Sequence, residues 1–173
     1  LDPKKFDTGI DLAISNIKRI SPESVDPRVK NYHWLDLVNG MFEAYDRGHY
    51  TAVLVDEENN VLEGPGFNIF SLDGNGLKTP KIGVLEGITR QTAIRLASEL
   101  DIPVQEKLIG SEEFINSDEA FATSTAGGII PITKINGKKI NNGKIGKVTS
   151  LLKNLYWEKH TDPQWSQSVD ELI

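Results

Sequence analysis

The sequence predicts an α+β fold, and three observations support this prediction. Two pairs of strand-like segments flank short polar turns, which is typical of β-hairpins. Three longer segments have apolar residues at helical spacing. These strands and helices do not follow the regular strand–helix–strand alternation of a parallel sheet. The 173 residues, of which 38% are apolar and 25% charged, suit one globular domain with its own core.

Seven segments have the short apolar or β-branched pattern of strands, and turn residues separate them. We expect strands at residues 11–20, 51–55, 61–62, 67–72, 77–79, 103–109 and 119–123. The turns at residues 57–60 and 73–76 join two pairs of these strands into hairpins. The last strand is expected to run into a loop at residues 124–128.

The apolar spacing predicts three long helices at residues 35–47, 87–100 and 145–160. Gly48 follows the first of them, where a glycine often ends a helix. Ser111 is expected to start one further short helix, because two glutamates follow it.

Composition excludes several classes of function. With 19 basic and 25 acidic residues the net charge is −6, which argues against a nucleic-acid or membrane-surface partner. No apolar run approaches the ~20 residues that cross a bilayer. There is no cysteine, so disulfides and thiolate chemistry are excluded, and a cytoplasmic location is expected. The three histidines lack metal-ligand spacing, so no metal site is expected.

Four short stretches contain residue types that could perform chemistry. They span residues 29–34, 62–70, 83–90 and 123–131. Each also has an ordinary structural explanation. The first could hold a surface lysine, the second a turn carboxylate, the third a helix cap and the fourth a simple turn.

The functional interpretations of these stretches are specific. Lys30 lies among apolar and aromatic residues, where a lysine amine can attack a carbonyl. Glu63 lies between a strand and a Gly-Pro-Gly bend, and could face a fixed cation. The helix start at residues 87–89 presents backbone N–H groups to an anion. The small residues of the fourth stretch let the backbone approach a ligand closely.

Taken together and in this order, the four stretches resemble the fold type IV family of pyridoxal-phosphate (PLP) enzymes. The family contains branched-chain and D-amino-acid aminotransferases, (R)-selective amine transaminases and aminodeoxychorismate lyase. The resemblance continues through residues 142–149 into the last helix, so it covers most of the chain. It implies an α+β architecture of mixed β-sheets with flanking helices.

Within this family, residues 30–34 and 64–68 look most like the (R)-selective amine transaminase branch. The branched-chain branch has a tyrosine five residues after the lysine, and this chain has Leu35 at that position. A tyrosine partner for the cofactor phenolate must therefore come from elsewhere or be absent.

The resemblance implies PLP as the cofactor, bound to Lys30 as a Schiff base, with Lys30 as the catalytic residue. It matches Glu63 to the partner of the pyridine nitrogen and Leu85 to the residue on the ring face. It also matches three residues to the phosphate site, namely Ile88, Thr89 and Thr125.

The resemblance also implies the composition of the substrate pocket. Trp34 and the loop residues Thr125 and Ala126 would line it, and Gly127 and Gly128 would leave space in the opposing loop. An indole wall suits an aryl or alkyl group better than a second carboxylate.

In this family a smaller N-terminal domain supplies a phosphate-binding arginine, and the active protein is a homodimer. None of the five arginines here matches that arginine (Arg19, Arg28, Arg47, Arg90 and Arg95). We therefore interpret residues 1–173 as the larger, C-terminal PLP-binding domain, and expect the smaller domain upstream of Leu1.

The expected reaction transfers an amino group from an (R)-amine, or a D-amino acid, to a keto acid such as pyruvate. Three alternatives remain open. The first is a branched-chain or D-amino-acid aminotransferase. The second is a PLP lyase of the aminodeoxychorismate type, which needs no keto acceptor. The third is a non-catalytic dimerisation domain, which would form no coloured adduct at Lys30.

Overall fold

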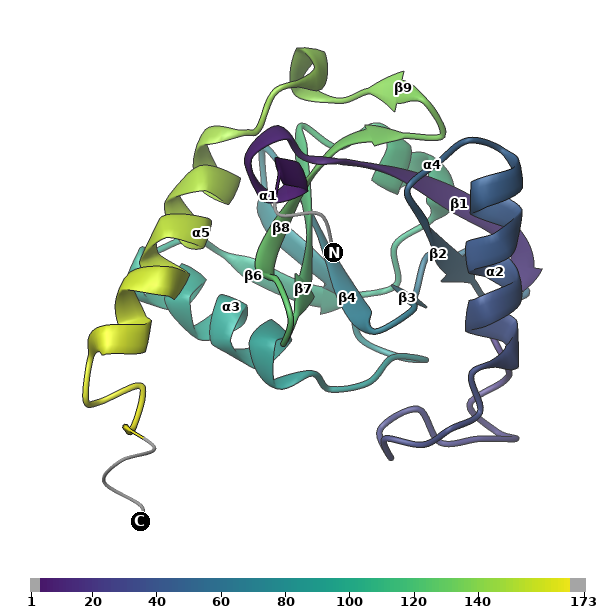
Figure 1. The fold of residues 1–173 in the computed structure, drawn as a ribbon, viewed down its shortest axis with the longest axis horizontal. Helices are drawn as coiled ribbons and strands as arrows, with labels where there is room; N and C mark the ends of the chain where they lie inside the picture. Colours follow the sequence, from purple (N-terminus) through teal and green to yellow (C-terminus); the bar gives the residue numbers. More distant parts are fainter. Residues whose placement is uncertain (1–3, 169–173) are drawn as a thin grey trace.

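A mixed nine-stranded β-sheet organises residues 4–168, the part of the chain that the computed structural model describes (Figure 1). Seven strands follow the order β2-β1-β8-β7-β4-β5-β6, while β3 pairs with β4 and β9 with β8. The strands are β1 (Ile10–Lys18), β2 (Thr51–Val55), β3 (Glu63–Gly64), β4 (Phe67–Asp73), β5 (Gly76–Pro80), β6 (Val104–Lys107), β7 (Glu119–Ser124), β8 (Gly128–Ile135) and β9 (Lys138–Lys139).

Five α-helices surround this sheet in the described residues. They are α1 (Lys4–Thr8), α2 (Leu35–Asp46), α3 (Ile88–Glu99), α4 (Ser111–Ile115) and α5 (Lys147–Glu158), with 3-10 turns η1 (Asn141–Gly143) and η2 (Lys159–Thr161). Helix α2 packs on β1 and β2, whereas α3 and α5 pack against each other and against β7 and β8 (Figure 1). No helix within residues 4–168 is long and apolar enough to cross a membrane.

The sheet combines both kinds of strand pairing. Strands β1 and β2 are parallel and joined through α2, and β5 and β6 are parallel and joined through α3. Strands β4, β5, β7 and β8 form antiparallel pairs. The predicted α+β class is confirmed. The two parallel crossovers were not predicted, because strand-like and turn signals do not show which strands become neighbours.

The core consists of buried side chains between the sheet and its helices. Beneath α3 and α5, Phe70 and Phe121 from adjacent strands stack with ring centroids 4.7 Å apart. Leu37 of α2 packs with Leu54 and with small residues of β1 and β2. Burial of such side chains contributes about 1.5–3 kcal/mol each, and it holds α2, α3 and α5 against the strands whose ends form the site.

Most of the expected elements are present. The helices predicted at residues 35–47 and 87–100 are α2 and α3, and the second hairpin is β4–β5. The first hairpin is only partly formed, because Val61 makes a single antiparallel bridge to Val55. The last helix, α5, begins two residues later than the predicted start at Ile145.

The prediction of a loop at residues 124–128 is wrong at its end, since β8 begins at Gly128 and continues through Pro131. Proline and glycine weaken a strand pattern, because proline lacks an N–H group and glycine has no side chain to pack. Strand β8 tolerates Pro131 because β1 pairs with it only from Ile132 onward. Its other neighbour, β7, pairs along residues 128–132.

Candidate active site

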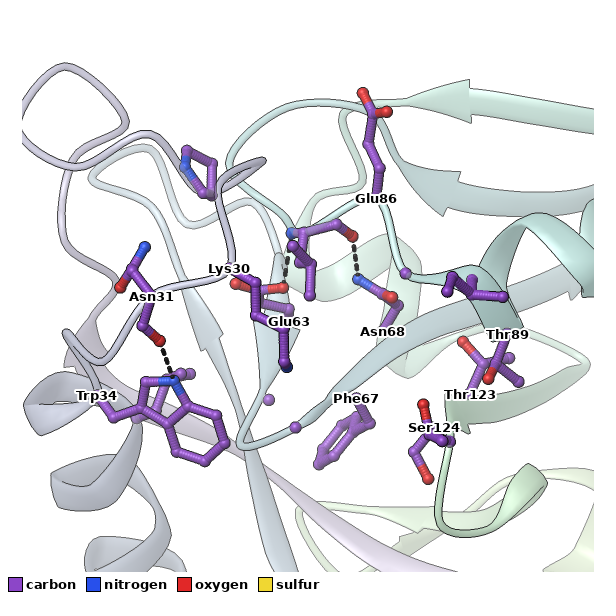
Figure 2. A pocket seen from close by; sticks show the side chains of 18 of the residues that line it. Lys30, Asn31, Trp34, Glu63, Phe67, Asn68, Glu86, Thr89, Thr123 and Ser124 are labelled. Atoms are coloured by element: carbon purple, nitrogen blue, oxygen red, sulfur yellow. Dashed lines mark hydrogen bonds between the residues drawn. The ribbon is translucent and has the colours of Figure 1, made fainter. Parts of the chain in front are cut away.

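A cavity of about 340 Å³ lies where β3, β4 and β7 meet two loops, residues 27–34 and 85–87. This volume is typical of sites for small molecules. Its lining includes residues from all four stretches singled out in the sequence, although these lie up to about 100 residues apart. Figure 2 shows Lys30 and Glu63 toward the left of the cavity and Thr89 toward the right.

Glu63 is the most strongly fixed acidic group of the cavity. It lies on β3 opposite Asn68 and is only 6% exposed. Its Oε2 accepts a hydrogen bond from the Leu85 backbone N–H at 2.8 Å. Burial raises the pKa of the Glu63 carboxyl, while the Leu85 N–H and the Arg19 guanidinium act in the opposite direction.

Arg19, which follows β1, is the basic partner of Glu63. Its Nε and Nη2 donate to Glu63 Oε1 at 3.3 and 3.2 Å. Its Nη1 donates to Asp36 Oδ2 at 2.6 Å. This contact was not predicted from the sequence, because Arg19 and Glu63 are 44 residues apart and no motif joins them.

Asn68 was also missed as a member of the site. Its Nδ2 donates to the Leu85 carbonyl at 2.8 Å, so Glu63 and Asn68 hold the Leu85 backbone from both sides (Figure 2). A Cβ atom at Gly87 would lie 2.4 Å from Asn68 Oδ1, and this close approach explains the glycine. Leu85 itself lines the cavity.

Lys30 lies in an irregular segment between β1 and α2. Its side chain is exposed yet contributes to the cavity lining. The structure therefore gives Lys30 access to both solvent and the cavity. Apolar neighbours do not enclose it as the sequence had suggested.

The start of α3 forms the opposite wall of the cavity. Gly87 is the N-cap residue, so Thr89 is not the cap, and no side chain caps this helix. Within residues 4–168 no group accepts a hydrogen bond from the backbone N–H of Ile88 or Thr89, as expected in a first helical turn. Ile88, Thr89 and Thr125 all line the cavity.

The residues expected around the substrate are only partly brought together. Trp34 lines the cavity, and its Nε1 donates to the Asn31 carbonyl at 3.0 Å. Ala126 is exposed and lies outside the lining.

The expectation that Gly127 and Gly128 leave space in the pocket is wrong. A Cβ atom at Gly127 would lie 2.6 Å from Ile130, and one at Gly128 would lie 2.5 Å from Tyr156. Both glycines are therefore needed for internal packing. Neither lines the cavity.

The cavity contains a primary amine, a buried carboxylate and unpaired helix N–H groups. These groups suit a ligand with a carbonyl carbon, a basic ring nitrogen and an anionic group, respectively. Among the described residues, no cluster of three or more His, Asp or Glu side chains could hold a metal ion.

Comparisons with known sequences give one consistent result. The family model described as amino-transferase class IV matches residues 2–135. A putative branched-chain-amino-acid aminotransferase of Methanocaldococcus jannaschii is 34% identical over 171 residues, covering 98% of this chain and 59% of that protein. The branched-chain-amino-acid aminotransferase of Escherichia coli strain K12 is 30% identical, covering 95% of this chain and 55% of that protein.

Solved structures share the fold. A branched-chain amino acid aminotransferase of T.th., solved with pyridoxamine 5′-phosphate, has a TM-score of 0.88 at 29% identity, covering 94% of this chain and 56% of that chain. A putative branched-chain amino acid aminotransferase of Thermotoga maritima has a TM-score of 0.85 at 31% identity, covering 95% and 60%. The chain thus spans between half and two thirds of the length of these relatives.

Proposed function

Because the chain belongs to the amino-transferase class IV family, we propose that it is the PLP-binding part of an aminotransferase. The observation that carries this proposal is the single cavity shared by Lys30, Glu63 and the open start of α3. These three features lie on separate elements, and each suits a different part of the cofactor.

The donor set fits PLP group by group. A primary amine, that of Lys30, matches the cofactor aldehyde. A buried carboxylate, that of Glu63, matches the ring nitrogen, and the free N–H groups of Ile88 and Thr89 match the phosphate. Thr125 adds a hydroxyl at the same end, and Leu85 would pack on the ring face.

When bound, PLP supplies an electron-poor ring that can accept charge from the substrate carbon. Lys30 would bind the aldehyde carbon through Nζ and, once released, would move a proton at Nζ. Glu63 would accept a hydrogen bond from the protonated ring nitrogen and so hold that proton in place. The α3 start and Thr125 would orient the phosphate.

We propose a branched-chain amino acid as the amino donor and a keto acid as the acceptor. The support comes from relatives that are 30–34% identical to this chain and whose names specify branched-chain amino acids. A cytoplasmic location stays a prediction from the cysteine-free composition.

A second candidate donor is an (R)-amine or a D-amino acid. Two observations favour it, namely Trp34 in the cavity lining and Leu35 at the position expected to hold tyrosine. Leu35 is 74% exposed and does not line the cavity. Residue 35 thus cannot replace the hydroxyl that the tyrosine of the branched-chain branch has at this position.

An assay of the full-length protein with PLP tests both candidates. A branched-chain L-amino acid, D-alanine, and (R)- and (S)-1-phenylethylamine are each supplied with and without a keto acid. Highest turnover with the branched-chain L-amino acid supports the first donor, and preference for the (R)-amine or D-alanine supports the second.

The variant Lys30→Ala is the control, because it lacks the lysine amine that would bind PLP. Product formed without a keto acid would instead identify a lyase. If no coloured PLP adduct forms, the remaining alternative is that the chain is a non-catalytic dimerisation domain.

A further inference from the structure

One buried and one partly buried carboxylate share one guanidinium beside the cavity. The side chains of Arg19, Asp36 and Glu63 are 6%, 15% and 8% exposed. Arg19 contacts Asp36 Oδ2 at 2.6 Å and Glu63 Oε1 at 3.2 Å. With all three ionised, this triad carries a net charge of −1. Arg19 therefore supplies the positive charge that faces both carboxylates and favours the charged form of Glu63.

The triad also joins three elements. Arg19 directly follows β1, Asp36 lies in the first turn of α2 and Glu63 lies on β3. Asp36 Oδ2 additionally accepts the Ile20 backbone N–H at 2.7 Å. The contacts of Asp36 thus close the base of the irregular segment 19–34, which carries Lys30. One guanidinium consequently connects the base of that segment to Glu63.

The charge of Glu63 depends on its surroundings. Arg19 and the Leu85 N–H favour the carboxylate, while Asp36 and burial favour the neutral acid. Lys30 and Glu86 are the other charged side chains that line the same cavity. Without Arg19, the buried Glu63 carboxyl would lose its basic partner and would take up a proton more readily. A neutral Glu63 could not pair with a protonated ring nitrogen.

We propose that Arg19 and Asp36 are positioning residues that set the ionisation of Glu63 and tie it to the base of the segment carrying Lys30. This inference rests on the proposed function, in which Glu63 is the partner of the ring nitrogen. The two residues act on Glu63 with opposite sign. Arg19 stabilises its charged form, and Asp36 destabilises it while anchoring Arg19.

The test uses four variants of the full-length protein: Arg19→Met, Arg19→Lys, Asp36→Asn and, as a matched control, Arg28→Met. Arg28 lies in the same segment but forms its ion pair with Asp26 on the protein surface, and its side chain is 70% exposed. The Glu63 carboxyl is followed against pH by infrared difference spectroscopy in the cofactor-free protein. The signal that disappears in Glu63→Gln assigns it.

Arg19→Met should raise the titration midpoint of Glu63 by about one to three pH units. Asp36→Asn should lower it, Arg19→Lys should fall between wild type and Arg19→Met, and Arg28→Met should leave it unchanged. In the PLP-loaded enzyme, Arg19→Met should reduce kcat at least tenfold at neutral pH with a smaller change in substrate KM. Raising the pH should partly restore kcat, because Glu63 then ionises.

A merely structural role predicts a different pattern. Equal midpoints in all variants, or shifts of the same sign for Arg19→Met and Asp36→Asn, would overturn the inference. Circular dichroism checks that each variant is folded, and if Arg19→Met does not fold, Arg19→Lys and Asp36→Asn decide the matter. Failure of the wild type to bind PLP would refute the proposed function alone, since the midpoints are measured without cofactor.

Discussion

At the scale of single residues, the candidate site depends on polar groups that other side chains hold in place. Glu63 is fixed on one oxygen by Arg19 and on the other by the Leu85 N–H. Asn68 holds the Leu85 carbonyl in turn. Lys30 differs from them, because it is exposed and lies in an irregular segment. The Glu63 carboxylate is thus held in place before a ligand binds, whereas the Lys30 amine is free to approach a ligand.

We expect Lys30 to be the lysine that binds PLP. Reduction of the PLP-loaded protein with borohydride, followed by peptide mapping, should place the pyridoxyl group on Lys30, because this lysine lines the cavity. Lys30→Ala should lose the label. Lys81, which does not line the cavity, provides the matched variant Lys81→Ala, which should keep it. A label on any other lysine would refute the assignment.

Glu63→Gln should preserve the shape of the site while removing its charge. Turnover should fall tenfold or more, which corresponds to a loss of at least about 1.4 kcal/mol of transition-state stabilisation. Single-turnover kinetics with saturating PLP measures this. Unchanged turnover would show that another group holds the ring nitrogen.

Glu63 should also make the free energy of unfolding of the cofactor-free protein depend on pH. Burial is the main reason that the folded pKa of Glu63 lies above its unfolded value. The folded protein therefore binds this proton more tightly, so its stability contribution is present below the unfolded pKa of about 4.3 and is lost as the pH rises through the folded pKa. Urea unfolding at several pH values should show this loss in the wild type and not in Glu63→Gln.

At the scale of elements, α3 is anchored from below its first turn. Arg90 is 1% exposed and donates to Thr79 Oγ1 at 3.2 Å, to the Pro80 carbonyl at 2.9 Å and to Glu106 Oε2 at 2.6 Å. Its guanidinium is thus occupied by β5 and β6 and does not line the cavity. Arg90 holds the helix in place, while the free N–H groups of Ile88 and Thr89 remain available to an anion.

Thr89→Ala and Thr125→Ala should each weaken PLP binding about tenfold, because each removes one hydroxyl donor to a charged phosphate. The effect on turnover at saturating PLP should be smaller. Thr92→Ala is the matched control on the same helix, since Thr92 does not line the cavity. Equilibrium titration followed by absorbance measures the affinity, and wild-type affinity in the double variant would contradict the assignment.

Helix α2 is tied to β1 by Glu43. The carboxylate accepts hydrogen bonds from Ser15 Oγ, from the Asn16 backbone N–H and side-chain Nδ2 at 2.9 and 2.6 Å, and from Arg47 Nη1 at 3.1 Å. Burial raises the pKa of Glu43, but these hydrogen bonds outweigh burial, and the pKa is lowered overall. Glu43 therefore stabilises the folded state in its charged form.

Glu43→Gln should lower the free energy of unfolding by about 1–2 kcal/mol at neutral pH. A carboxyl with a lowered folded pKa contributes stability that is present above its unfolded pKa and is lost as the pH falls through the folded pKa. The difference between variant and wild type should therefore shrink below about pH 4. Urea unfolding measures it, with the exposed Glu57→Gln as control. A difference independent of pH would contradict this assignment.

At the scale of the whole molecule, the described residues form the walls of one cavity but leave apolar surface uncovered. Leu35, Phe42 and Tyr45 lie seven and then three residues apart on α2, which places them on one side of the helix. They are 74%, 55% and 51% exposed. Exposed apolar stripes of this kind are typical of surfaces that contact another domain or subunit.

We propose that the active protein is a homodimer that also contains a smaller N-terminal domain. The 173-residue chain alone should bind PLP at least tenfold more weakly than the full-length protein, because the phosphate-binding arginine of that domain would be missing. Analytical ultracentrifugation and PLP titration of both proteins test this. Full activity of the isolated, monomeric chain would refute it.

The sequence by itself determined the elements that depend on local interactions. The apolar spacing of α2 and α3 and the polar turn between β4 and β5 are visible within short windows. Residue chemistry and order also singled out Lys30, Glu63 and Thr89, which the structure brings to one cavity. Helix periodicity and turn chemistry are local properties, so one chain segment is enough to reveal them.

Only the tertiary structure decided which distant residues are partners. Strand β8 forms although Pro131 lies within it, because β7 pairs with it and β1 joins only beyond the proline. Gly128 proved to be required by contact with Tyr156 of α5, not by the cavity. Arg19 became the partner of Glu63 only when β1 and β3 were brought together. Pairing and burial across such separations depend on the packed sheet, and residue types within one window do not encode them.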